Sequence, residues 1–376
     1  MTTTGQIVDG IVRALQAAGI DVAPGEVALE RPQRPEHGDL SSNIALVVAA
    51  RAGRAPRAIA EDLAGRLGAF DLPHVEAAEV AGPGFVNLRV RPSYFHEALA
   101  AVLAAGPEDY ARPDVGHGER VQVEFVSANP TGPLHVGNGW FASFGDALAR
   151  LLARCGYVVE REYYLNDTGN QIRLLGESLL ARRAGTAPPE AGYQGAYLVE
   201  LAASYDGPDD ATAAGRFAST AVVENIRATL ARLGIVYDEW YSQASIEESG
   251  QVDETIAILR EKGLVYDKDG ATWFASSEHG DNRDRVLITS AGERTYFAGD
   301  IAYHRDKFLV RGFDRVIDVF GADHHGQVPS LRAGVAALGV DPGRLEVELG
   351  QLVSLVSGRM SKRSGQYVRL DELIDT

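Results

Sequence analysis

Two loops of the sequence combine residue types that suit the binding of a phosphate chain. In the first, "SANPTGPLHVGNGW" at 127–140, one histidine, His135, stands among five Pro and Gly residues, between an apolar run and a helical pattern at 139–155. Backbone N–H groups at a helix start lack partners and attract anions, and glycine lets a ligand approach them closely. The same loop could also serve only as a connection, so the rest of the chain must decide.

The second loop, "SGRMSKRSG" at 357–365, places Arg359, Lys362 and Arg363 beside glycine and small hydroxyl residues. Cations on a loop can stabilise the charge that develops on a leaving pyrophosphate. A basic stretch of this kind is more often only a solvated turn. Together, however, the two loops favour a site for a nucleoside triphosphate.

The elements around these loops predict an α/β fold. From 121 onward, strand patterns such as "VQVEFVS", "YVVEREYYL", "RTYFAGD" and "RVIDVFGAD" alternate with helical patterns, one of them at about 170–183. This order is typical of a parallel sheet, which binds ligands beyond the carboxyl ends of its strands. The first loop follows such an end. Stretches near 183–215 and 264–294 interrupt the order and are predicted to be insertions.

Residues 1–110 are predicted to form a separate, small α+β domain. Ile7, Ile11 and Leu15 have helical spacing, Pro56 can open a second helix, and "GFVNLRV" at 84–90 alternates like a half-buried strand. The polar stretch that follows is rich in Gly and Pro, and we place a linker at 111–120. The α/β domain then occupies 121–376.

The composition excludes several other classes of protein. The 376 residues are 45% hydrophobic and 23% charged, which is typical of soluble globular proteins, and no apolar run is long enough to span a membrane. The single Cys155 permits no intramolecular disulfide, and we expect it to be packed. A net charge of −16 argues against nucleic-acid binding through the whole surface, so any such binding must use local patches.

The two loops resemble the ATP-binding signatures of class I aminoacyl-tRNA synthetases, with "HVGN" in place of HIGH and "RMSKR" in place of KMSKS. Four further stretches resemble arginyl-tRNA synthetase: "EFVSANPTGPLHVG", "YYLNDTGNQIRLLGESL", "GDIAYHRDK" and "GADHHGQ". "PEHGDLSSNIAL" and "AGPGFVNLRV" resemble the N-terminal domain of that family, which contacts the tRNA elbow. The resemblance covers nearly all of 1–376 and implies a Rossmann-like catalytic domain with insertions.

The resemblance also implies the residues that bind each substrate. His135, Lys362 and Arg363 would act as catalytic groups that face the phosphates together with Mg²⁺. The ATP-binding residues would be Pro133, His135, Gly137, Asn138, Gly139, Met360, Ser361 and Lys362. The substrate arginine would be held by Glu124, Ser127, Asn129, Tyr296, Asp300 and Asp323, because a guanidinium needs carboxylates and neutral acceptors at fixed positions.

Other interpretations of single residues stay open. Asp300 could instead be the N-cap of a helix. The adjacent pair His324 and His325 lacks the usual spacing of zinc ligands, so no metal held by the protein is expected. Asn138 replaces the second histidine of HIGH and can donate a hydrogen bond but cannot be cationic. Three arginines, Arg51, Arg54 and Arg57, could contact tRNA phosphates, although a solvated basic face is at least as common.

The function implied is ATP-dependent activation of L-arginine to arginyl-adenylate and transfer to the 3′ end of tRNA(Arg), by a monomer in the cytoplasm. The family's C-terminal anticodon-binding domain is not found in the sequence, so we expect either a fragment or a shortened relative. Two alternatives remain. One is a shortened paralogue that adenylates arginine for an acceptor other than tRNA, and the other is a non-catalytic tRNA-binding regulator.

Overall fold

The computed structural model of the chain describes every residue except 1, 71, 352, 354–362 and 364–366. The chain forms two compact units, an N-terminal unit at Met1–Ala111 and a larger unit at Arg112–Thr376. Each unit has its own hydrophobic core. Within the described parts of the chain, every helix is too short or too polar to cross a membrane.

The N-terminal unit packs helices against a small antiparallel sheet. The strands β1 (Leu40–Ser42), β2 (Val75–Ala81) and β3 (Phe85–Val90) lie in the order β1-β3-β2. The helices are α1 (Thr3–Ala17), α2 (Ile44–Ala52), α3 (Pro56–Ala69) and α4 (Pro92–Asp109), with short 3₁₀ turns at Pro24–Glu26 and Pro35–His37. Ile7, Ile11 and Leu15 are buried in its core, as their helical spacing predicts, and Pro56 is the first residue of α3.

The larger unit is built on a five-stranded parallel sheet with the order β11-β10-β4-β5-β6. Its strands are β4 (Arg120–Glu124), β5 (Val158–Leu165), β6 (Glu239–Ser242), β10 (Arg315–Gly321) and β11 (Leu345–Gly350). The chain moves outward from β4 to β5 and β6, and later adds β10 and β11 on the other side of β4. The order therefore reverses between β4 and β10, where such sheets form a ligand-binding crevice at the carboxyl ends of their strands. The predicted parallel α/β fold is confirmed.

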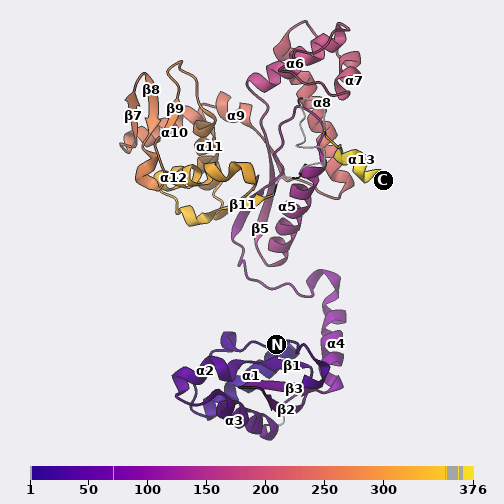
Figure 1. Cartoon of the computed structure of the whole chain (residues 1–376), viewed down its shortest axis with the longest axis vertical. Helices are drawn as coiled ribbons and strands as arrows, with labels where there is room; N and C mark the ends of the chain where they lie inside the picture. The colour runs from indigo at the N-terminus through magenta and orange to yellow at the C-terminus, as the bar shows by residue number, and fades with distance from the viewer. Residues whose placement is uncertain (1, 71, 352, 354–362, 364–366) are drawn as a thin grey trace. The chain divides into compact units, whose positions relative to one another are not determined.

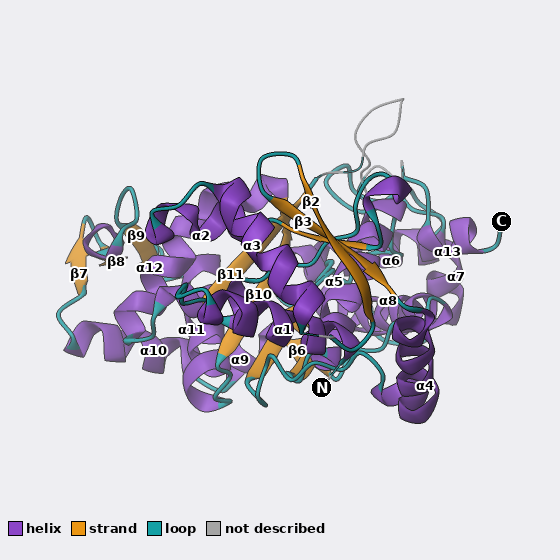
Figure 2. Cartoon of the chain, turned by 90° about the horizontal axis from the view of Figure 1, so that it is seen from below, coloured by secondary structure: helices purple, strands orange, loops and turns teal. Residues whose placement is uncertain are grey.

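Helices cover both faces of this sheet (Figure 2). On one face, Val121, Val123 and Phe125 pack with α5 (Val136–Arg154) and α8 (Ala211–Arg232). The other face is covered by α11 (Tyr296–Arg305), by the π-helical segment η4 (Asp306–Val310) and by α12 (Val328–Leu338). The helix predicted from 139 begins at Val136, so the first loop leads directly into the amino end of α5.

The remaining elements lie around the sheet (Figure 1). In this view α6 (Asn170–Arg183), α7 (Tyr197–Ser204) and α8 lie together, while α10 (Gln251–Glu261) lies beside a second, antiparallel sheet. That sheet consists of β7 (Val265–Lys268), β8 (Ala271–Phe274) and β9 (Arg285–Ile288). The other short elements are α9 (Gln243–Glu248), η3 (Ser276–His279), η5 (Ala322–Gln327), η6 (Pro342–Arg344) and α13 (Leu370–Ile374). A Cβ on Gly176 would lie 1.8 Å from the Ala211 carbonyl oxygen, so glycine permits the close contact of α6 with α8.

The prediction of a strand at "RTYFAGD" is wrong. Thr295 is the N-cap of α11, and its hydroxyl accepts a hydrogen bond from the Ala298 N–H. Tyr296 and Phe297 favour strands by their side chains, but the cap and the contacts of α11 decide the conformation. The interpretation of Asp300 as an N-cap is also wrong, because Asp300 lies in the second turn of the helix.

Candidate active site

The turn after β4 places Glu124 and Ser127 against each other. Val126 and Ser127 both have positive φ, 70° and 37°, and the Ser127 N–H donates to the Phe125 carbonyl at 3.0 Å. This γ-turn is strained for a β-branched residue, and such strain occurs mainly at functional sites. The turn brings the Ser127 hydroxyl back to donate to Glu124 Oε1 at 2.8 Å, while it accepts from the Tyr164 N–H at 3.1 Å.

His135 is the N-cap of α5 and forms a reciprocal pair with Asn138. The Asn138 N–H donates to His135 Nδ1 at 3.2 Å, and the His135 N–H donates to Asn138 Oδ1 at 3.0 Å. In a neutral imidazole only one nitrogen carries a proton. Because Nδ1 accepts, the proton is on Nε2, which can then donate to a ligand. Asn138 thus holds the histidine and is itself buried.

Gly137 and Gly139, two of the three glycines in this loop, are required by different contacts. A Cβ on Gly137 would lie 3.0 Å from His135 Cε1, so glycine lets the imidazole lie close to the helix backbone. A Cβ on Gly139 would lie 2.7 Å from Leu370 Cδ1, so this glycine permits the packing of α13. Chain packing alone therefore explains Gly139.

The residues that follow the second loop pair with the first loop. The Val136 N–H donates to the Val368 carbonyl at 3.0 Å, and the Leu370 N–H donates to the Leu134 carbonyl at 2.8 Å. On the other side, the Gln194 N–H donates to the carbonyl of Arg363 at 3.1 Å. Of the second-loop candidates, Met360, Ser361 and Lys362 lie outside the described residues, as does Arg359.

One cavity of about 280 Å³ gathers candidates from both loops. Its lining includes Asn129, His135, Asn138 and Arg363, together with Gln171 of α6 and Tyr193, which the sequence did not single out. Pro133 is buried in the same loop. The polar lining and the amino end of α5 suit a phosphate chain.

The Asp300 carboxylate has no hydrogen bond or ion pair among the described residues. Burial raises its pKa to about 6; His304 opposes the shift, while Glu124 and Asp318 add to it. Burial also raises the pKa of Glu124, an effect that the Lys307 ammonium opposes. Two neighbouring acids with one uncompensated carboxylate are suited to receive a cation.

Tyr296 and Asp323 lie apart from the His135 cavity. Tyr296 is 68% exposed and lines another cavity, of about 680 Å³, with Thr168 and Arg294. Asp323 lies in η5, just beyond β10, with its Oδ1 4.0 Å from His324 Nε2. The structure therefore brings Glu124 and Ser127 together, and it places Asn129 and His135 in one cavity, but it puts Tyr296 on a different one.

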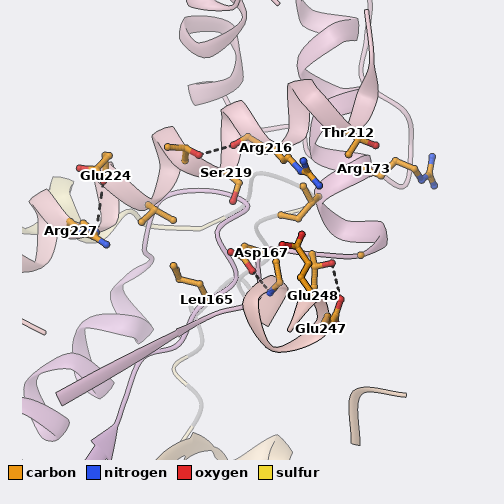
Figure 3. A pocket seen from close by; sticks show the side chains of 16 residues that line it. Leu165, Asp167, Arg173, Thr212, Arg216, Ser219, Glu224, Arg227, Glu247 and Glu248 are labelled. Atoms are coloured by element: carbon orange, nitrogen blue, oxygen red, sulfur yellow. Dashed lines mark hydrogen bonds and ion pairs between the residues drawn. The ribbon is translucent and has the colours of Figure 1, made fainter. Parts of the chain in front are cut away.

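A third cavity, of about 490 Å³, lies between the loop after β5, α8 and α9 (Figure 3). Asp167 on its wall accepts from the Ser242 hydroxyl at 2.7 Å and from the Ala244 N–H at 3.0 Å. Arg216 and Ser219 of α8 line the opposite side. None of the predicted site residues is among those that line this cavity.

Sequence reasoning missed a group of buried charges beneath the site. Lys307 donates to Glu124 and to Asp318, and His304 lies against Asp318. The available signal was an acid inside an apolar strand: Asp318 interrupts "RVIDVF" much as Glu124 interrupts "VQVEF". Within the described residues, no three His, Cys, Asp or Glu side chains form a group that could hold a metal ion.

Comparisons with known proteins agree with the arrangement of both units. The family described as "Arginyl tRNA synthetase N terminal domain" matches residues 5–90, and "tRNA synthetases class I (R), catalytic domain" matches residues 99–376. The arginine--tRNA ligase of Carboxydothermus hydrogenoformans is 43% identical over 99% of this chain and 70% of its own length. That of Syntrophotalea carbinolica is 45% identical over 93% of this chain and 66% of its own length.

The fold agrees as well. The solved structure of arginyl-tRNA synthetase from Thermus thermophilus covers 98% of this chain with a TM-score of 0.67, at 24% identity. The chain spans about two thirds of the length of the curated relatives it matches. Because the class I catalytic model covers most of the chain and the relatives match nearly all of it, the chain belongs to the arginyl-tRNA synthetase family, the aminoacyl-tRNA ligases for arginine.

Proposed function

We propose that this chain activates L-arginine with ATP and transfers it to the 3′ end of tRNA(Arg), using the site at the carboxyl ends of β4 and β10. The observation that carries the proposal is the arrangement after β4: Glu124, held by the Ser127 hydroxyl, ends the strand, and the loop that follows leads to His135 at the amino end of α5. A cation site beside an anion site is what arginine and ATP together require. Neither substrate alone explains both.

The residues of the crevice then divide between the substrates. Glu124 and Asp300 receive the guanidinium, Ser127 fixes Glu124, and Asn129 binds the amino and carboxylate end of arginine. The family resemblance assigns Tyr296 and Asp323 to this subsite as well, although in this structure Tyr296 lines a different cavity. His135 Nε2 donates to the phosphates, and the second loop supplies Lys362 and Arg363 to pyrophosphate as it leaves.

The reaction needs no covalent enzyme intermediate. The arginine carboxylate attacks the α-phosphorus of ATP, the bond to the bridging oxygen breaks, and pyrophosphate leaves. A ribose hydroxyl of the terminal adenosine then attacks the arginyl carbonyl and AMP leaves. Mg²⁺ enters as the complex with ATP, since this ion is usually held by substrate phosphates and one or two carboxylates.

The setting of the reaction follows from its substrates. We infer that the chain acts in the cytoplasm, where ATP, arginine and tRNA are available, and that it acts as a monomer. The N-terminal unit would bind the tRNA elbow, as the family match at 5–90 supports.

Pyrophosphate exchange with ATP and each of the twenty amino acids, with and without tRNA, tests the activation step. We expect exchange with arginine only, stimulated by tRNA, and arginine attached to tRNA in a charging assay. Exchange without charging would favour adenylation for another acceptor. Binding of tRNA without either reaction would favour a regulator.

A further inference from the structure

Three carboxylates form a row across the middle of the parallel sheet. Asp318 of β10 is in register with Glu124 of β4, which is in register with Glu162 of β5. Neighbouring strands are about 4.8 Å apart, and all three residues are buried. A sheet face under a helix is normally apolar, so such a row is costly unless cations neutralise it.

Lys307 neutralises two members of the row. Its Nζ donates to Glu124 Oε2 and to Asp318 Oδ1, each at 2.8 Å, and its side chain is 0% exposed. The same Nζ lies 4.2 Å from the centroid of the Tyr303 ring. Lys307 belongs to the π-helical segment η4, and π-helical turns occur frequently at functional sites.

His304 supports the far side of this pair. Its Nδ1 lies 2.7 Å from the Asp300 carbonyl oxygen, and its Nε2 lies 2.9 Å from Asp318 Oδ2. The imidazole thus bridges the Asp300 carbonyl and the Asp318 carboxylate. Asp318 is held between His304 and Lys307, and it in turn directs Lys307 toward Glu124.

The charges around Asp318 leave it ionised. Burial alone would raise the pKa of Asp318, but Lys307 and His304 outweigh it and hold that pKa well below the ordinary range. Burial would likewise lower the pKa of Lys307, and the carboxylates of Asp318 and Glu124 reverse the direction. The ammonium therefore stays charged beneath Glu124.

We infer that Lys307 is a positioning residue of the arginine subsite: its ammonium holds the Glu124 carboxylate in place and supplies a counter-charge beneath it, so that Glu124 can receive the substrate guanidinium. The inference rests on the proposed function. Without Lys307, Glu124 and Asp318 would face each other as buried, uncompensated carboxylates, and one of them would take up a proton. A protonated Glu124 could still accept a hydrogen bond but would lose its charge.

Arg311 provides a matched control within the same row. Its guanidinium pairs with Glu162 and Glu160 and shows no contact with Glu124, and Glu162 also accepts from the Tyr303 hydroxyl. Removing Arg311 takes a cation from the same buried row but removes no direct contact of Glu124. The two cations thus separate a structural role from a positioning role.

The experiment compares Lys307→Met, Lys307→Arg and Arg311→Met in the full chain, with tRNA present. We expect Lys307→Met to raise KM for arginine by about 100-fold, with KM for ATP changed by less than about threefold, and Lys307→Arg to recover most of the loss. Citrulline, the neutral analogue of arginine, should inhibit the unmodified chain and the Lys307→Met variant about equally well. Arg311→Met should lower Tm and leave the ratio of the two KM values unchanged.

Equal loss of arginine and ATP binding in Lys307→Met, or the same arginine defect in Arg311→Met, would overturn the inference. If Lys307→Met does not fold, the double variant that combines Glu124→Gln with Lys307→Met should fold, because it removes both charges of the pair. Its arginine defect should equal that of Glu124→Gln alone, and a further loss would contradict the role assigned to Lys307. Calorimetry measures arginine binding to the unmodified chain and requires no turnover. Absence of binding there would show separately that the proposed function is wrong.

Discussion

Asp300 is the residue at which arginine selection can be tested most directly. Replacing it by Asn removes one partner of a desolvated charge pair, which costs about 3 to 5 kcal/mol when the other charge stays buried. Asp300→Asn should therefore raise KM for arginine by on the order of 100-fold or more and leave KM for ATP nearly unchanged. The matched control is Thr295→Ala, which removes the true cap of α11 and should cost about 1 kcal/mol of stability. Arginine affinity unaffected by Asp300→Asn would remove this residue from the subsite.

The raised pKa of Asp300 has consequences for pH dependence. With a pKa of about 6, the carboxyl group is protonated below pH 6, so arginine affinity should fall roughly tenfold per pH unit there. The stability of the free protein changes with pH in the opposite direction. The folded form binds this proton more tightly than the unfolded form, in which the pKa of the carboxyl group has its ordinary value of 3.8. The stability from this group is present below that value and lost as pH rises through 6. Asp300→Asn should thus raise Tm at pH 7.5 more than at pH 5, and equal shifts would contradict the burial of a charged Asp300.

At the scale of elements, the amino end of α5 depends on Asn138. Its Oδ1 accepts from the backbone N–H of His135, the N-cap, and its own N–H donates to His135 Nδ1, so Asn138→Ala should cost about 1 kcal/mol, lower Tm by about 2 to 4 °C and raise KM for ATP. Asn138→Asp keeps an acceptor oxygen. It should preserve Tm but raise KM for ATP, because a carboxylate would face the phosphates. A Tm loss as large in Asn138→Asp as in Asn138→Ala would show that the side-chain oxygen at 138 does not stabilise the start of α5.

The sequence predicts most elements of the sheet but not the layer beneath the site. Alternating and apolar runs locate β4, β5 and β10, and the Gly-rich turn locates the start of α5. The sequence does not predict helix α11 because Tyr296 and Phe297 favour strands, whereas the only signal for the helix is the single cap residue Thr295. Lys307 is not predicted for another reason: Glu124 is 183 residues away along the chain, and only the pairing of β4 with β10 brings Glu124 beside Asp318, the other partner of Lys307. Local patterns cannot contain such a contact.

For the whole molecule, tRNA binding must occur on a protein of strongly negative net charge. The three candidate arginines of the N-terminal unit are all exposed and paired: Arg51 with Glu26, Arg54 with Asp62 and Arg57 with Glu61. Exposed ion pairs of this kind contribute about 0 to 1 kcal/mol each. Phosphates could therefore replace these carboxylates at little cost, so the pairing does not exclude a contact with tRNA.

The salt dependence of tRNA binding distinguishes the two interpretations of these arginines. Each phosphate contact releases counterions and adds about 0.7 to 0.9 to the slope of log affinity against log salt concentration. If all three contact tRNA, the variant Arg51→Ala, Arg54→Ala, Arg57→Ala should lower that slope by about 2 to 3 and raise KM for tRNA, while kcat and KM for arginine stay unchanged. Arg260→Ala is the control, because it breaks an equally exposed pair with Asp267 in the larger unit. An unchanged slope in the triple variant would identify the three arginines as a solvated basic face and would move the elbow contact to other residues of the N-terminal unit.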